Sequence, residues 1–73
     1  MTTILAIGKF IHKERKKQKL SLAKLSTKAF GNPYRASAIG EIEKANMPDV
    51  TFQTIDKLLI ALGYSLKDLF LAN

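Results

Sequence analysis

The residues of this sequence best suited to chemistry are cations, and they gather near its beginning. Twelve Lys and Arg face six Asp and Glu in the 73 residues, a formal net charge of +6. Residues 1–28 hold eight of the twelve cations and, in Glu14, one acidic residue, so their charge is +7, whereas residues 29–73 come to −1. A basic surface of this kind attracts polyanions, nucleic acid first and an anionic membrane surface second.

Catalytic and metal chemistry find little support in the sequence. His12 is the only histidine, and it has no acidic or cysteine companions at the spacing of metal ligands. Because the chain has no cysteine, it can form neither a disulfide framework nor a cysteine zinc site. No set of nucleophile, base and oxyanion donors can be assembled. We therefore expect no enzyme activity, no metal, no cofactor and no small-molecule ligand.

The length of the chain limits the elements that can position these residues. Seventy-three residues make one small domain, since a chain of this size buries only about 60% of its unfolded surface. Apolar residues make up 47% of the sequence and must form a core without disulfides. We expect a single all-α domain over residues 1–73, in the cytoplasm.

The first helix is predicted over residues 4–19, with a basic outer face. On a helical wheel Ile4, Ile7 and Ile11 fall within about 60° of one another, and most lysines of the segment fall on the far side. Arg15 instead projects close to the edge of the apolar stripe. We therefore expect Arg15 to have a partner inside the fold.

The second and third helices are separated by a tight turn. Ser21 is a good N-cap for a helix from about residue 22, and Gly31-Asn32-Pro33 ends that helix with residues that favour turns. A third helix follows over about residues 35–44, with Ile39 and Ile42 expected in the core. Small residues on its exposed face would let it approach another surface closely.

A fourth and a fifth helix are predicted after residue 50. Thr51 is a good N-cap for the fourth, and Gly63 ends it. The predicted apolar stripe of this helix consists of Phe52, Ile55, Leu58, Leu59 and Leu62. Ser65 with Asp68 resembles a capping box that opens the fifth helix.

In their order and spacing, these segments resemble the Cro/phage-repressor (Xre-type) helix-turn-helix family over residues 7–70. The resemblance rests on Ile7-Gly8-Lys9-Phe10-Ile11 with Arg15, Leu20-Ser21, Ile39 with Ile42-Glu43, Pro48, Ile55-Asp56-Lys57-Leu58, Ala61-Leu62-Gly63 and Ser65-Leu66-Lys67-Asp68-Leu69-Phe70. It implies a five-helix, lambda-repressor-like helix-turn-helix domain whose third helix enters the major groove of DNA. The turn at residues 30–34 is longer than is usual in the family, and Ala45 stands where a glycine often follows the Ile-Glu pair.

The resemblance also implies which residues meet DNA. The base-reading positions would be Arg35, Ala36, Ser37, Gly40 and Glu41. Arg35 is the favoured reader because a guanidinium can bond guanine O6 and N7 together, and its alternative is a phosphate contact. The phosphate positions would be Ser21, Lys24, Lys28, Lys44, Asn46, Thr51 and Lys9, with a solvated face as the alternative for Lys9.

One ion pair is implied in the same way. The family places an acidic residue at the position of Glu43, opposite an arginine at the position of Arg15, which agrees with the position of Arg15 on the helical wheel. Such a pair would hold the third helix against the first. The alternative is two separately solvated charges.

The implied function is that of a sequence-specific, double-stranded-DNA-binding transcriptional regulator, a repressor acting as a homodimer on a palindromic operator. Its origin would be bacterial, phage or plasmid. An apolar self-contact would involve Ile60, Tyr64, Leu66, Phe70 and Leu71, with ordinary core packing as the alternative. A second interpretation is an antitoxin-like or accessory module that holds a protein partner. A basic first helix lying on a membrane is disfavoured by the layout that follows it.

Overall fold

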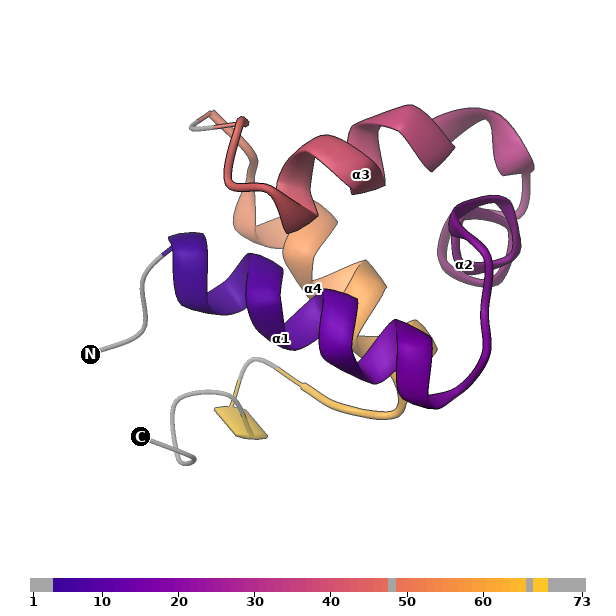
Figure 1. Cartoon of the computed structure of the whole chain (residues 1–73), viewed down its shortest axis with the longest axis horizontal. Helices are drawn as coiled ribbons and strands as arrows, with labels where there is room; N and C mark the ends of the chain where they lie inside the picture. The colour runs from indigo at the N-terminus through magenta and orange to yellow at the C-terminus, as the bar shows by residue number, and fades with distance from the viewer. Residues whose placement is uncertain (1–3, 48, 66, 69–73) are drawn as a thin grey trace.

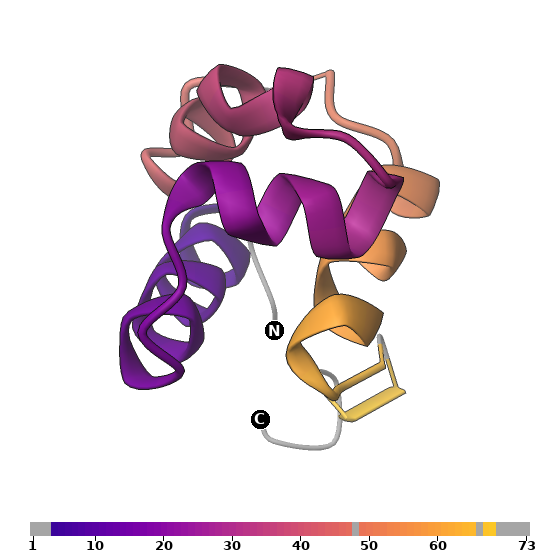
Figure 2. The same ribbon diagram turned by 90° about the vertical axis from the view of Figure 1, so that its right-hand side faces the viewer.

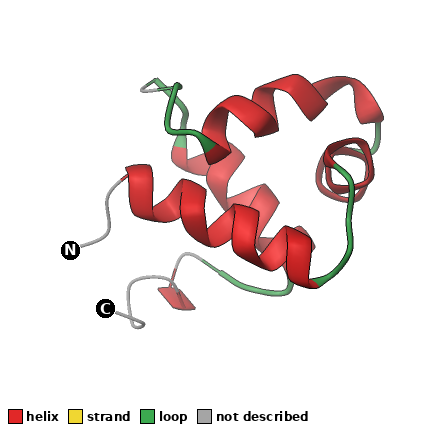
Figure 3. Cartoon of the chain, in the orientation of Figure 1, coloured by secondary structure: helices red, strands yellow, loops and turns green. Residues whose placement is uncertain are grey.

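The described part of the chain is all-α. A computed structural model describes residues 4–47, 49–65 and 67–68, and within these ranges there is no strand (Figure 3). The elements in chain order are α1 (Ile4–Lys17), α2 (Leu22–Phe30), a 3₁₀-helix (Pro33–Arg35), α3 (Ala36–Glu43) and α4 (Phe52–Leu62). Figure 1 shows α3 above α1, and Figure 2 shows α2 crossing in front of them. No helix in these ranges is long and apolar enough to cross a membrane.

The described residues hold four α-helices, not the five that were predicted. Of the predicted fifth helix, Leu66 and residues 69–71 lie outside the described ranges. Its predicted capping box is confirmed, because the backbone N–H of Ser65 donates to Asp68 Oδ2 at 3.0 Å and the N–H of Asp68 donates to Ser65 Oγ at 3.3 Å.

The third helix begins later than predicted. Tyr34 and Arg35 lie in the 3₁₀-helix, and α3 starts at Ala36. The cause is local, since Asn32 Oδ1 accepts a hydrogen bond from the N–H of Tyr34 at 3.1 Å and Pro33 fixes its own φ. The chain therefore makes one tighter turn before α3.

The predicted caps of α2 and α4 are confirmed. Ser21 Oγ accepts from the N–H of Lys24 at 3.0 Å, and Thr51 Oγ1 accepts from the N–H of Thr54 at 3.2 Å. Each hydroxyl satisfies one of the N–H groups that have no partner within the helix. Both helices end at a left-handed glycine, Gly31 and Gly63.

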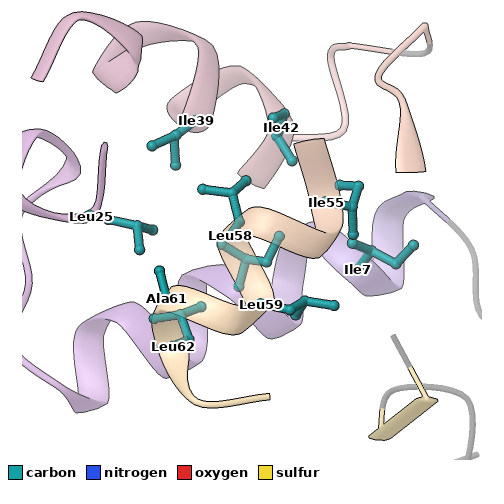
Figure 4. Packing of buried hydrophobic residues seen from close by; sticks show 10 residues of the cluster. Ile7, Leu25, Ile39, Ile42, Ile55, Leu58, Leu59, Ala61 and Leu62 are labelled. Atoms are coloured by element: carbon teal, nitrogen blue, oxygen red, sulfur yellow. The ribbon is translucent and has the colours of Figure 1, made fainter. Parts of the chain in front are cut away.

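The core lies between the inward faces of all four helices (Figure 4). It consists of Ile7, Ile11, Leu25, Ile39, Ile42, Ile55, Leu58, Leu59, Ala61 and Leu62. Phe52 was predicted to belong to the apolar stripe of α4, but it is not buried with the rest of that stripe, because it is 71% exposed. It is the first residue of α4, and side chains lean towards the beginning of their helix, so its ring projects past the end of the buried stripe.

Helix α1 crosses the end of α3 at close range. A Cβ atom on Gly8 would lie 2.5 Å from the carbonyl oxygen of Ile42 and 2.9 Å from that of Glu43. Only a residue without a side chain fits there. This contact and the core beneath it fix where α3 lies relative to α1.

Candidate nucleic-acid interface

The outer face of α3 is solvent-exposed and carries no bulky side chain. Ile39 and Ile42 point inward and are 1% and 3% exposed. Ser37 and Glu41 lie on the exposed side, followed by Lys44 just after the helix. This face therefore offers the polar side chains of Ser37 and Glu41 to an approaching surface.

Two of the predicted base-reading positions are less open than expected. Ala36 and Gly40 are both half-buried. A Cβ atom on Gly40 would lie 3.4 Å from Leu22 Cδ1, so this glycine marks the contact between α2 and α3. Their role as readers stays a prediction.

Arg35 lies towards α4. Its guanidinium carbon is 4.9 Å from the centre of the Phe30 ring, at the end of α2. Lys57 Nζ, from α4, is 5.9 Å from the same ring centre. Each distance is within the range of a cation–π interaction. Arg35, Lys57 and Phe30 also line one polar hollow together with Gln53 and Thr54.

Arg15 and Glu43 come together as the sequence suggested. Arg15 Nε donates to Glu43 Oε2 at 2.7 Å, and Arg15 Nη2 donates to Glu43 Oε1 at 3.1 Å. The remaining nitrogen, Nη1, donates to the carbonyl oxygen of Leu20 at 2.9 Å. The two side chains are 8% and 6% exposed, so the pair is shielded from solvent and ties the end of α3 to α1.

His12 completes this cluster. Its Nδ1 lies 2.8 Å from Glu43 Oε1, and because a carboxylate can only accept, Nδ1 carries the proton. Burial of Glu43 opposes its ionisation, but the hydrogen bonds and positive charges of Arg15 and His12 outweigh that effect and lower its pKa. Glu43 is therefore held as a carboxylate.

Ser26 is a positioning residue that was not predicted from the sequence. It is fully buried, and its Oγ donates to the carbonyl oxygen of Asn32 at 2.6 Å and accepts from the N–H of Arg35 at 3.1 Å. The longer turn is thus tied to α2 by one hydroxyl group. A signal was present, since Ser26 stands midway between Leu22 and Phe30 on the apolar side of α2.

The predicted phosphate contacts are all at the surface or near it. Ser21, Lys24 and Lys28 are exposed along α2, Lys44, Asn46 and Thr51 are exposed on either side of the loop after α3, and Lys9 is exposed on α1. The hydroxyls of Ser21 and Thr51 are already engaged as helix caps. A hydroxyl has a second lone pair, so capping leaves it able to bind another group.

The residues predicted for self-contact are placed differently from one another. Ile60 is 61% exposed on α4. Tyr64 makes contacts within the chain. Its hydroxyl donates to Glu14 Oε1 at 2.9 Å, and its ring packs edge-on against the Phe10 ring, with 5.1 Å between the two ring centres. The hydrogen bond to Glu14 raises the pKa of Tyr64. Leu66, Phe70 and Leu71 lie outside the described residues.

Comparisons with known proteins assign no family to the chain. No family model matches it, and no curated protein or solved structure does either. The resemblance drawn from the sequence stays a prediction, and the case for a function rests on the residues described above.

Proposed function

We propose that this protein is a sequence-specific, double-stranded-DNA-binding transcriptional regulator of the lambda-repressor-like helix-turn-helix type, with α3 in the major groove. The observation that carries the proposal is the outer face of α3, which exposes the polar side chains of Ser37 and Glu41 and has no bulky apolar side chain. A helix must bring such groups within hydrogen-bonding reach of base edges to read them.

The rigid attachment of α3 supports this proposal. The Arg15–Glu43 pair holds one end of the helix, and Ser26 holds the turn at the other end. A helix fixed at both ends loses little conformational freedom when it binds, so more of its contact energy appears as affinity.

The division of charge supports a DNA partner as well. Lys24 and Lys28 on α2 carry part of the cationic excess, as do the exposed lysines of α1, whereas α3 contains no cation. In this proposal α1 and α2 attract and grip the sugar–phosphate backbone. Ser37 and Glu41 then supply the choice of sequence, with Glu41 accepting from cytosine N4.

A homodimer acting as a repressor is part of the proposal. One module of this size buries only about 600–1,000 Å² of protein surface on DNA, and a second copy is the usual way to useful affinity. We assign the self-contact to Ile60, an apolar residue of α4 that is 61% exposed. Two copies would place two α3 helices on half-sites about one helical turn apart.

Selection of duplexes from a random pool, followed by fluorescence anisotropy with the selected site, tests the proposal. We expect a palindromic site whose base preference changes with Ser37→Ala or Glu41→Gln. Lys24→Gln should instead weaken binding to every duplex by the same factor and reduce the salt dependence. A steep salt dependence without any preferred sequence would mean that α3 does not read bases.

A second candidate, a module that binds another protein, is favoured by one observation. Tyr34 is 88% exposed beside the start of α3, and aromatic residues are enriched in protein interfaces. Isolation of a stoichiometric protein complex in which Tyr34 is protected, together with absence of duplex binding, would favour this candidate over the first.

A further inference from the structure

Two cations from distant parts of the sequence converge on one aromatic ring. Arg35 ends the 3₁₀-helix, Lys57 lies in α4, and the Phe30 ring at the end of α2 is 4.9 Å from the guanidinium carbon and 5.9 Å from the ammonium nitrogen. Both cations are exposed, whereas the ring is half-buried. One half-buried ring is therefore shared by two exposed charged side chains from different elements.

No carboxylate in the described ranges is ion-paired with either cation, because the ion pairs there are those of Glu43 with Arg15 and His12. Like charges near one ring repel each other. A cation–π contact at an exposed site contributes only about 0.5–1 kcal/mol. An anion placed between the two cations would interact favourably with both.

The chemistry of the hollow indicates what kind of anion fits. Besides the two cations it is lined by Phe30, Gln53 and Thr54, and none of these lining residues is acidic. A guanidinium offers paired donors that match phosphate oxygens, and an ammonium adds a point charge. The hollow is open to solvent, and Arg35, which lines it, directly precedes the first residue of α3.

We propose that Arg35 and Lys57 form a clamp for one phosphate of the DNA backbone at the start of α3. This inference rests on the proposed function and changes the role of Arg35, because a phosphate contact fixes register and orientation but carries no base preference. It also adds Lys57, on α4, to the DNA-binding surface. Phe30 is then a positioning residue for both cations.

The experiment measures duplex affinity of the full chain by fluorescence anisotropy over a range of salt concentrations. The variants are Arg35→Gln, Lys57→Gln and the double substitution. We expect the double variant to weaken binding by the same factor for the selected site and for an unrelated duplex. We also expect its salt slope to fall by about 1, the value for one lost phosphate contact. The factors by which the two single substitutions weaken binding should not multiply in the double variant, because both cations bind the same phosphate.

Lys67→Gln is the matched control. It removes the same charge from an exposed lysine, and its short segment lies at the opposite end of the molecule from α3 (Figures 1 and 2). Arg35→Lys is a second control, which keeps the charge but loses the paired donors. It should retain the salt slope and lose part of the affinity.

The outcomes separate the clamp from the proposed function. If the wild-type chain binds DNA and Lys57→Gln behaves like Lys67→Gln, the clamp is wrong while the function stands. If Arg35→Gln alters the preferred base at one position and keeps the wild-type salt slope, Arg35 reads a base and the clamp is again wrong. If the wild-type chain binds no duplex at any salt concentration, the proposed function itself fails.

Discussion

Arg15 and Glu43, 28 residues apart in sequence, are joined by two hydrogen bonds of 2.7 and 3.1 Å between α1 and α3. Because both side chains are shielded from solvent, neither charge has water as a substitute partner. A pair of this kind contributes little net stability as a whole, but loss of one member leaves the other buried and uncompensated. The position of α3 therefore depends on both residues being present and charged.

Glu43→Gln should lower the free energy of unfolding by about 3–5 kcal/mol, because it leaves the Arg15 guanidinium without a counter-charge. Urea denaturation measures the change. Glu41→Gln is the control, since Glu41 is exposed on the same helix and should change stability by less than about 0.5 kcal/mol. Equal stability of the two variants would show that the pair does not hold α3.

The free energy of unfolding should fall at acidic pH because the Glu43 carboxylate becomes protonated. The pKa of Glu43 in the folded state lies below its ordinary value of 4.5. A carboxyl group of this kind contributes stability that is present above the unfolded pKa and is lost as the pH falls through the folded pKa. The difference in unfolding free energy between wild type and Glu43→Gln should therefore be constant near neutrality and shrink below pH 4.5. A difference independent of pH would contradict this linkage.

Ala45→Gly should stabilise the protein by about 1 kcal/mol. Ala45 has φ of 59°, in the left-handed region that costs a residue with a Cβ atom about 1–2 kcal/mol and costs glycine little. Thermal unfolding measures the gain. Ala23→Gly, at an exposed position within α2, is the control and should cost about 0.5–1 kcal/mol. A loss of stability in both variants would rule out strain at Ala45.

Ser26→Ala should cost about 1–3 kcal/mol, because it leaves the N–H of Arg35 and the carbonyl of Asn32 without their buried partner. Thr27→Ala removes a neighbouring hydroxyl that is exposed and bonded within α2, and should be nearly neutral. Hydrogen exchange of the Arg35 amide gives a local readout, which should accelerate only in Ser26→Ala. Unchanged protection would mean that the turn is held by other contacts.

Gly8→Ala should destabilise the contact between α1 and α3 more than Gly31→Ala destabilises its turn. The added methyl group at residue 8 would lie 2.5 Å from the carbonyl oxygen of Ile42, whereas at residue 31 nothing lies within 4 Å and only the left-handed backbone is strained. We expect a loss of about 1–3 kcal/mol or more for the first and about 1 kcal/mol for the second by urea denaturation. The reverse order would mean that α1 shifts without cost.

The features that could be predicted from the sequence are those set by neighbours along the chain. The caps at Ser21 and Thr51 involve an acceptor and an N–H three residues apart, and the inward position of Arg15 follows from helical periodicity. The direction of the Arg35 side chain could not be predicted in this way. Its direction depends on where Phe30 and α4 lie after folding, and no local spacing contains that information.

Phe52 and Ser26 show the same limit for burial. Periodicity placed Phe52 on the apolar stripe of its helix, but a stripe does not show where the neighbouring helices stop covering it. Ser26 is polar and fully buried because the turn after α2 folds back over it. A helical wheel of α2 alone places Ser26 on the apolar side, but it contains no turn and so does not show which groups the buried hydroxyl bonds.

The longer connection between α2 and α3 has a mechanical consequence. Extra residues ordinarily let two helices move independently, but here one oxygen atom, Ser26 Oγ, bridges both ends of the connection. Helices α2 and α3, with their connection, should therefore move as one rigid unit. Adjustment to a curved groove would then come from the segment after Lys44, where α3 leads into α4.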